Sequence, residues 1–266
     1  MLRCQVARDM STVEKAISLL DFFTEDAPEW GLSELARQAK FDKATTRRLL
    51  VALARSGFVE QHAVTRRYQL GAGVLRLARV RESHFPLLQV SVPIVRDIAV
   101  LTDETVHLSE FGVRGLVTVH VQESTKANRV SVAIGQILPL HATASGIAFL
   151  AFSPPELVKS YLRKPLTAFT QHTLVQPARL GEVIKAAAGQ GYSRGEQGYE
   201  DGVFSIAAPI LGLDGYAIGS VAIAMPQSRT TKAITDLHVK AVRDAADHIS
   251  AQLFGERPVP RRSHIA

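Results

Sequence analysis

Apolar residues recur every three or four positions over the first 56 residues, with polar residues between them, which is the pattern of amphipathic helices. Ser11 and Glu14 have the spacing of a capping box and mark the start of the first helix. Pro28 and Gly31 interrupt the pattern, and Gly57 stands where glycine often follows a helix end. The sequence therefore predicts three helices, at residues 11–23, 32–40 and 44–56.

Residues 58–71 change to the alternation of short strands, with Phe58 and Val59 expected to pair with residues 68–70 across a polar turn. Three short helices followed by a hairpin is the order of a winged helix-turn-helix, and the join of about four residues between the second and third helices suits that motif. The stripe of apolar residues over 72–85 predicts a helix that links this domain to the rest of the chain.

The remainder of the chain contains both the helical spacing and the strand alternation of apolar residues. A helix over residues 85–104 is predicted to bend near Pro93, and a closing helix over roughly 230–254 is predicted to bury Leu237 among other apolar residues. Apolar or alternating strands are predicted at 105–111, 116–124, 204–211 and 216–226, with shorter helices between them. An antiparallel sheet with flanking helices is an α+β fold. The predicted division is a winged helix-turn-helix at 1–71, a linker helix at 72–85, a second domain at 86–256 and a disordered tail at 257–266.

Composition narrows the class of protein. Of the 266 residues, 46% are hydrophobic, which suffices for packed cores and argues against global disorder. No apolar run approaches the ~18 residues of a membrane span, and the first ten residues lack the apolar core of an export signal. Cys4 is the single cysteine, which excludes an intrachain disulfide or a multi-cysteine zinc site and suits a cytoplasmic protein.

Positive charge is concentrated near the N-terminus. Residues 37–67 hold eight Lys or Arg against two acids, whereas residues 86–260 hold fifteen of each sign. A basic patch on one small element is typical of a polyanion binder, although a solvated basic face remains an alternative. Because a helix-turn-helix places the start of its second helix in the major groove, the third predicted helix supplies the expected contacts to double-stranded DNA. They are Lys43, Thr45, Thr46, Arg47 and Arg48, with Arg66 and Arg67 of the hairpin following the DNA backbone.

The sequence offers little sign of catalysis. It contains no Walker loop, H-E-x-x-H or G-x-S-x-G motif, and Ser145 has no base beside it in sequence. His107 and His120 lie on alternating strands, where a histidine is more typical of a hydrogen-bonded core than of a metal site. No cofactor, metal site or catalytic residue is therefore expected, and a binding domain is favoured over an enzyme.

A small-molecule pocket is one interpretation of three other stretches. His141, Thr143 and Ser145 lie among small residues, residues 193–202 form a polar loop punctuated by glycines, and Ser205 is a hydroxyl within an apolar strand. Apolar walls with a few convergent polar groups are the usual form of such a site. Ordinary loops and strand ends are the alternative.

The same stretches resemble the IclR family of bacterial transcriptional regulators over nearly the whole chain. The N-terminal likeness rests on "VEKAISLLDFF", "LSELARQAKFDKATTRRLLVAL", "GFV" and "RYQLG". The C-terminal likeness rests on "ETVHLSE", "LPLHATASGIAFLAF", "GYSRGEQGYEDGVFSIAAPI" and "GSVAIAMP". The resemblance implies a GAF-like effector domain, homodimers or tetramers on palindromic or repeated operators, and control of a catabolic operon, as repressor or activator, by a small organic, often aromatic, acid.

The resemblance also implies which residues line the effector pocket. They are Ala144, Ser145, Gly195, Glu196, Gln197, Val203, Ser205, Ala222 and Ala224. The sequence departs from the family where Ile147 stands in place of a common lysine, where Glu196 alone remains of an acidic loop, and where alanines replace the small polar residues of some members on the last strand. These departures predict a roomier, more apolar pocket and an effector bulkier than a two- or three-carbon keto acid.

Two other classes of function stay open from the sequence. One is an enzyme on the C-terminal domain with a regulatory DNA-binding domain, and the other is an architectural DNA binder that takes no ligand. For a regulator, the linker helix is the expected element that changes the spacing of two recognition helices, since an effector acts only through its preference for one arrangement.

Overall fold

The computed structural model describes residues 10–24, 26–84, 86–113, 115–256 and 258–263, so that Cys4 lies outside the described residues. The chain divides into two compact units, Met1–Phe85 and Pro86–Ala266. Helices and antiparallel strands occur in both units, which confirms the predicted α+β class.

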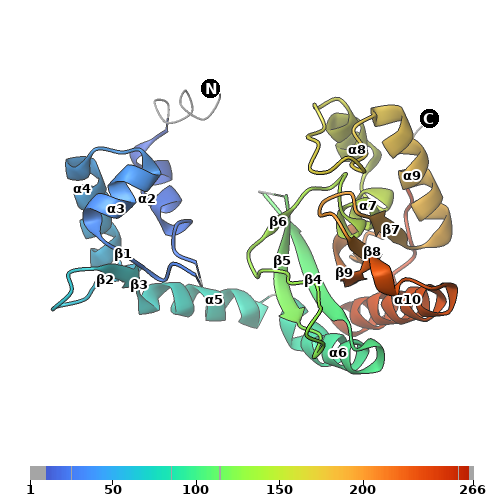
Figure 1. Ribbon diagram of the computed structural model, residues 1–266. Helices are drawn as coiled ribbons and strands as arrows, with labels where there is room; N and C mark the ends of the chain where they lie inside the picture. Colours follow the sequence, from blue (N-terminus) through green and yellow to red (C-terminus); the bar gives the residue numbers. More distant parts are fainter. Residues whose placement is uncertain (1–9, 25, 85, 114, 257, 264–266) are drawn as a thin grey trace. The chain divides into compact units, whose positions relative to one another are not determined.

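The first unit contains four described helices and a three-stranded sheet (Figure 1). The helices are α2 (Thr12–Leu20), α3 (Leu32–Ala39), α4 (Lys43–Arg55) and α5 (Ala72–His84), and the strands are β1 (Glu29–Trp30), β2 (Val59–Gln61) and β3 (Tyr68–Leu70). Strand β3 lies between β1 and β2, and Val59 pairs with Leu70 as predicted. The winged helix-turn-helix is thus confirmed.

Local sequence accounts for most of this unit. The Ser11 N–H donates to Glu14 Oε2 at 2.7 Å and the Glu14 N–H donates to Ser11 Oγ at 3.2 Å, completing the capping box. Strand β1 was missed, because the sequence around Trp30 shows only an interruption of the helices. The Trp30 indole donates to Phe22 O at 2.8 Å, and Trp30 pairs with Tyr68. A strand of two residues is too short to show alternation.

The "GAG" sequence at residues 71–73 allows a close approach of two backbones. Gly71 N donates to Phe58 O at 2.9 Å and Gly73 N donates to Gly57 O at 2.8 Å. A Cβ at position 71 or 73 would lie only 2.4 or 2.6 Å from Gly57 O. Only glycine fits there, and the first turn of α5 is therefore fastened to the end of α4.

The second unit is built on a six-stranded antiparallel sheet (Figure 1). Its order is β6 (Ile137–Leu138), β5 (Gly115–Gln122), β4 (Thr105–Gly112), β9 (Ala217–Pro226), β8 (Val203–Leu211) and β7 (Ser193–Glu196). The described helices are α6 (Leu87–Thr102), α7 (Ala144–Ala151), α8 (Pro155–Leu162), α9 (Pro177–Gln190) and α10 (Lys232–Phe254), with a short 3₁₀ helix η1 (Gln227–Arg229).

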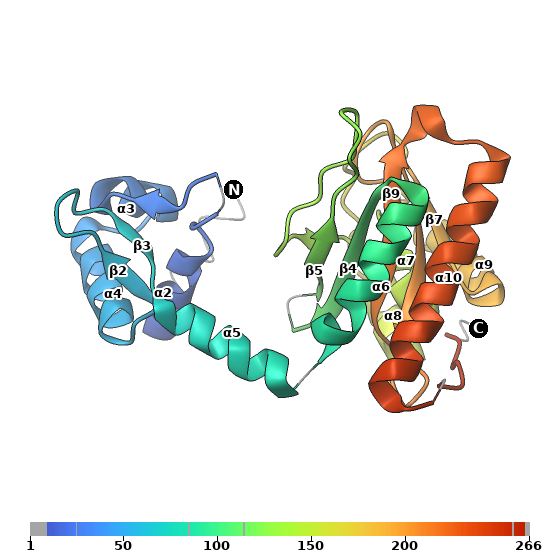
Figure 2. The ribbon, with the colours of Figure 1, turned by 90° about the horizontal axis from the view of Figure 1, so that it is seen from below.

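Helices cover both faces of this sheet, with α6 and α10 on the face nearer the viewer in Figure 2 and α7, α8 and α9 behind it. Val106 and Leu108 of β4 pack toward α6 and α10. His107 alternates to the other face, where its cross-strand neighbour Ala222 packs against Ala144 of α7. The period of the strand therefore brings His107 to the α7 side.

Three expectations for this unit are corrected. The polar stretch expected as a loop begins with strand β7, which pairs with β8. In α10, Leu237 is 41% exposed while His238 is buried. In the expected disordered tail, residues 258–263 are ordered: Ser263 N donates to Ala151 O at 3.0 Å and Ser263 Oγ to Leu150 O at 2.7 Å. Residues 257 and 264–266 lie outside the described residues.

Within the described residues, no single helix has the length and apolarity needed to cross a membrane.

Candidate functional site

Helix α4 presents an exposed basic face. Asp42 caps its N-terminus by accepting from Thr45 N at 2.7 Å. Hydrogen bonding from the Thr45 side chain, and then from its backbone N–H, lowers the pKa of the Asp42 carboxyl. Lys43, Arg47 and Arg48 are exposed, and none of the three forms an ion pair with another described residue. A cluster of cations without partners at a helix start is the arrangement that binds phosphates and base edges.

Thr46 does not belong to this face. Its side chain is fully buried, and its hydroxyl donates back to Asp42 O at 2.9 Å. Thr46 lies three, four and seven residues before the buried residues Leu49, Leu50 and Leu53, and so shares their side of the helix. The expectation that Thr46 contacts DNA is wrong for this reason. Thr45 is half-buried beside the cap.

The two wing arginines have different surroundings. Arg66 is exposed at the turn between β2 and β3, with a φ of 56°. Arg67 instead donates to Glu34 Oε2 at 3.0 Å and to Glu29 O at 3.1 Å, and lies 3.5 Å from the Glu29 carboxylate. Arg67 therefore ties the wing to β1 and α3, so the structure favours a structural role over the expected contact with the DNA backbone. Its contact lowers the pKa of Glu34, after the larger effect of the Gly31 N–H.

In the second unit, the start of α7 borders a narrow cavity. About 60 Å³ of it is open to the centre of a water molecule, which is room for several waters or part of a small organic molecule. Eight of the eleven expected effector residues line this cavity: Thr143, Ala144, Ser145, Gly195, Gln197, Val203, Ser205 and Ala224. Segments more than 50 residues apart in sequence are thus brought together.

Three expected residues do not line the cavity. His141 is buried between the Tyr161 hydroxyl, 2.7 Å from its Nδ1, and Thr167 O, 2.9 Å from its Nε2. Glu196 is exposed on the edge strand β7. Ala222 is buried against α7. His141 therefore supports the α8 side of the domain, and neither Glu196 nor Ala222 shapes the site.

The N-terminus of α7 supplies the strongest anion-binding groups of the cavity. Thr143 Oγ1 accepts from Gly146 N at 3.0 Å, and Thr143 O accepts from Ile147 N at 3.0 Å. The first N–H groups of a helix have no intrahelical partner, and Ala144 and Ser145, whose N–H groups are among them, line the cavity. Together with the helix dipole they favour a negative or carbonyl oxygen.

Gly195 keeps that helix end accessible. A Cβ at position 195 would meet Ser205 Oγ at 2.8 Å and Ala144 N at 2.9 Å. Any other residue at this position would press on the hydroxyl and the amide that a ligand would use. The glycine and Ser205 face each other because β7 and β8 pair in that register.

His107 and Ser145 form a buried pair, with 3.1 Å between Nε2 and Oγ. The sequence gives no hint of this base beside Ser145, because the two residues are separated by 38 positions. Desolvation lowers the pKa of His107 to about 4, whereas an effective general base has a pKa near the working pH. The pair is therefore suited to hydrogen bonding with a ligand and poorly suited to activating Ser145 as a nucleophile.

Charge is almost absent from the cavity. Among the described residues that line it, Glu200 is the only charged one, and no Lys or Arg is present. A ligand carboxylate would consequently depend on the α7 amides and on neutral hydroxyls. The structure also describes no group of three or more His, Cys, Asp or Glu side chains that could hold a metal ion.

The sequence missed one wall of the cavity. Val130, Ser131, Val132 and Gln136 belong to the segment between β5 and β6, and Gln136 Nε2 donates to the Tyr199 hydroxyl at 3.2 Å. These residues carry no chemical signal of their own. Only the pairing of β5 with β4 and β6 brings the segment to the start of α7.

Comparison with known proteins agrees with both domains. The model "IclR helix-turn-helix domain" matches residues 12–63, and the model "Bacterial transcriptional regulator IclR C-terminal" matches residues 82–251. The glycerol operon regulatory protein of Streptomyces coelicolor is 30% identical over 95% of this chain and 100% of its own length.

Solved structures are similar along almost the whole chain. An IclR-type protein of Silicibacter sp. is 37% identical with a TM-score of 0.81, over 94% of this chain and 98% of its own. An IclR homolog from Microbacterium hydrocarbonoxydans, solved with 4-hydroxybenzoate, has a TM-score of 0.81 at 23% identity, over 92% of this chain and 100% of its own. With both family models and a full-length relative in agreement, the chain belongs to the IclR family of transcriptional regulators, with a DNA-binding helix-turn-helix domain and an effector-binding domain.

Proposed function

We propose that this protein binds operator DNA through the exposed face of α4 and controls a catabolic operon in response to a small organic acid. The observation that carries the proposal is the start of α7, where Ala144 and Ser145 line a cavity without Lys or Arg. A regulator needs a site that recognises a small metabolite without binding every anion, and directional amides in a cavity that lacks cationic side chains satisfy that need.

The DNA contacts are assigned to Lys43, Thr45, Arg47, Arg48 and Arg66. Lys43 and Arg47 are four residues apart and share one side of the helix, and Arg48 lies beside them. Arginine pairs well with guanine, and lysine with phosphate. The exposure of these cations and their lack of ion pairs within the described chain support the assignment.

The effector is assigned to the aromatic acids. One carboxylate oxygen would accept from Ala144 N and the other from the Ser145 hydroxyl, while Val130, Val203 and Ala224 supply apolar walls. The relative that holds 4-hydroxybenzoate has the same fold and supports an acid of this size. Glu196, the last acid of the family's loop, does not line the cavity.

Self-association through the first unit completes the proposal. Val13 and Ile17 of α2 and Leu75 and Val80 of α5 are 71%, 49%, 63% and 52% exposed. Apolar side chains in such number on short helices indicate a protein partner, and a second copy with twofold symmetry would present two recognition helices to a palindromic operator.

Titration calorimetry of the full chain with 4-hydroxybenzoate, benzoate, pyruvate and glyoxylate tests the effector class. The aromatic acids should bind and raise the melting temperature in line with RT ln(1 + [L]/Kd). Tight binding of pyruvate or glyoxylate without binding of either aromatic acid would refute the aromatic assignment. Enrichment of duplexes from the protein's own genome, with and without the bound acid, then tests whether the ligand changes DNA affinity.

A further inference from the structure

One wall of the effector cavity has no regular structure of its own. Residues 123–136 connect β5 to β6 without a helix or strand, yet Val130, Ser131 and Val132 of this segment line the cavity. We call residues 123–132 the wall segment. Its position must be set by contacts with other parts of the domain, because backbone hydrogen bonds within it do not fix it.

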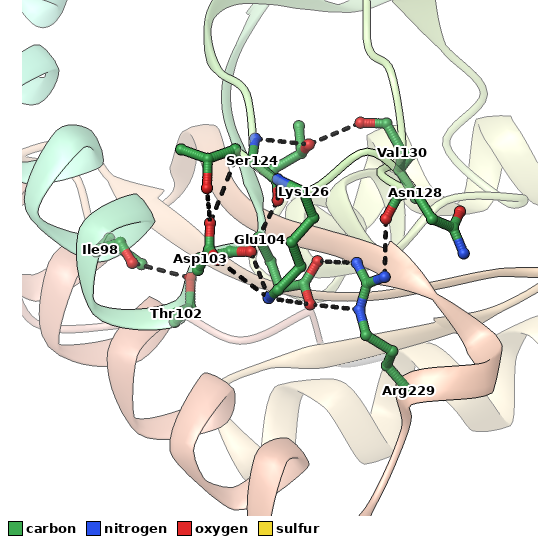
Figure 3. Close-up of polar contacts among 11 residues, drawn as sticks. Ile98, Thr102, Asp103, Glu104, Ser124, Lys126, Asn128, Val130 and Arg229 are labelled. Atoms are coloured by element: carbon green, nitrogen blue, oxygen red, sulfur yellow. Dashed lines mark hydrogen bonds and ion pairs between the residues drawn. The ribbon is translucent and has the colours of Figure 1, made fainter.

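A buried carboxylate provides the main contact. The side chain of Glu104, between α6 and β4, is only 4% exposed. Arg229 of η1 donates to both of its oxygens, from Nε at 2.8 Å and from Nη2 at 2.6 Å, and Lys126 Nζ lies 3.2 Å from Oε1 (Figure 3). A carboxylate this buried is stable only when paired and hydrogen-bonded, so both cations are held tightly; Glu104 in turn raises the pKa of Arg229.

The Arg229 guanidinium also holds the wall segment. Its Nη1 donates to Asn128 O at 2.7 Å, and two residues further on Val130 O accepts from Thr105 Oγ1 at 2.7 Å. Figure 3 shows the guanidinium between the Glu104 carboxylate and the Asn128 carbonyl. Arg229 therefore connects a buried acid directly to the backbone beside cavity-lining Val130.

The Lys126 ammonium reaches the end of α6. Its Nζ donates to Asp103 O at 2.7 Å, and Ser124 Oγ donates to the same carbonyl at 2.8 Å. Asp103 is the C-cap of α6, with a left-handed φ of 47°, and a cation there also suits the helix dipole. Helix α6 begins at Leu87, directly after the first unit of the chain.

We propose that Glu104, Arg229 and Lys126 are positioning residues that couple the wall of the effector cavity to α6. This inference rests on the proposed function, because it takes the effector to lie against Val130–Val132. A bound acid that shifts the wall segment must also shift Arg229 and Lys126, and these groups act on the last turn of the helix that follows the linker. None of the three residues lines the cavity, so their effect is indirect.

The wall segment also contains a residue suited to a matched control variant. Arg129 pairs with Glu123 at 3.0 Å, with side chains 39% and 45% exposed, and exposed pairs of this kind contribute little. R129Q therefore removes a cation from the same segment without touching Glu104. R229K keeps the charge but loses the forked geometry, and E104Q/R229Q removes both charges so that no unpaired buried acid remains.

Hydrogen exchange of the ligand-free full chain is the first test. R229Q and E104Q/R229Q should exchange faster in residues 123–132 and in the last turn of α6 together, with R229K intermediate and R129Q unchanged. Faster exchange in the wall segment alone, or equal effects of R229Q and R129Q, would overturn the coupling. If R229Q does not fold, the double variant decides.

The second test uses 4-hydroxybenzoate as the probe and measures DNA affinity with and without it. An effect of about five- to 150-fold is usual for such coupling. In R229Q and in the double variant this ratio should fall toward one while DNA affinity without the probe stays within about twofold of the wild type; R129Q should keep the ratio. A wild-type ratio of one for both 4-hydroxybenzoate and pyruvate would defeat the proposed function, whereas a normal wild-type ratio retained in R229Q would defeat only this inference.

Discussion

Two helices, α4 and α7, begin at the candidate functional surfaces, and their surroundings are opposite. Both are N-capped by a side chain, Asp42 for α4 and Thr143 for α7. The first turns of α4 are exposed and carry Lys43, Arg47 and Arg48. All eight residues of α7 are buried, and none is charged.

The difference matches the size and charge of the two proposed partners, operator DNA and a small acid. A polyanion is attracted over several ångströms by clustered cations in water, so long side chains at a helix start serve it best. A small acid must be distinguished from water and from other anions, so it is met by fixed amides where the dielectric constant is low. Under the proposed function, the same helix-terminal geometry serves attraction of DNA in one unit and selection of the acid in the other.

The largest expected effect is a loss of DNA affinity when the arginines of α4 are replaced. R47A and R48A should each weaken binding to a selected duplex by about 1–3 kcal/mol if each reads a base, and the double variant by about 2–6 kcal/mol. Fluorescence anisotropy at fixed salt measures this. R179A, which removes a surface cation paired with Glu182, is the control. A double variant within twofold of the wild type would place the DNA surface elsewhere.

The burial of His107 on the α7 side can be tested by acid stability. Burial lowers the pKa of His107 from 6.5 to about 4. The unfolded chain therefore binds a proton at this side chain below pH 6.5, whereas the folded chain binds it only near pH 4. Stability from this group is complete above pH 6.5 and is lost as pH falls through that window. At pH 5 the loss is about 2 kcal/mol relative to pH 7.

Urea unfolding at pH 7 and pH 5 checks this expectation. H107Q should lose less stability than the wild type between the two pH values, and H172Q, which alters an exposed histidine, should behave as the wild type. Equal losses in H107Q and the wild type would mean that His107 is hydrated in the folded protein.

A smaller change sharpens the assignment of ligand donors on α7. S145A removes the hydroxyl that lies 3.1 Å from His107, and should weaken binding of 4-hydroxybenzoate by about 1 kcal/mol, or five- to tenfold. Calorimetry measures this, with S153A as a matched serine change at the other end of α7. Unaltered affinity in S145A would leave the backbone amides as the only ligand donors there.

The smallest expected effects distinguish the roles of the neighbouring Arg66 and Arg67. R66A should weaken all duplexes alike and reduce the slope of log K against log[salt] by about 0.9. R67A should leave that slope unchanged and lower the free energy of unfolding by up to about 1 kcal/mol, because half-exposed ion pairs contribute little. Salt titrations and urea unfolding of both variants measure this. A reduced slope in R67A would restore that residue to the DNA surface.

Local features of the sequence predicted the first unit well. Capping, helical period and the charge of residues 37–67 all act over a few positions, and they located α4 and its cations. The error at Thr46 was avoidable, because its spacing from Leu49, Leu50 and Leu53 places it on the buried side. The ion pairs of Arg67 could not be predicted locally, since its partners Glu29 and Glu34 are more than 30 residues upstream.

In the second unit, the features that the sequence did not predict depend on contacts between residues far apart in the chain. The alternation of β4 located the strand but not the contact of His107 with Ser145, which depends on where α7 crosses the sheet. Ser263 lies 113 residues from Leu150, whose carbonyl it caps, and a proline-rich tail gives no local sign of docking. The cavity-lining residues Ala144 and Gly195 were predicted through family resemblance.

The contact of Gly57 with Gly71 and Gly73 has a practical consequence for building chimeric sensors. Because those glycines lock the first turn of α5 to the end of α4, a graft of a foreign effector domain at residue 71 would cut through a packed joint. A junction after α5, near residues 84–86, preserves the contact between Gly57 and the two glycines. It also transfers α5 together with the DNA-binding domain. We therefore expect that ligand specificity can be exchanged between relatives by fusing their effector domains at residues 84–86.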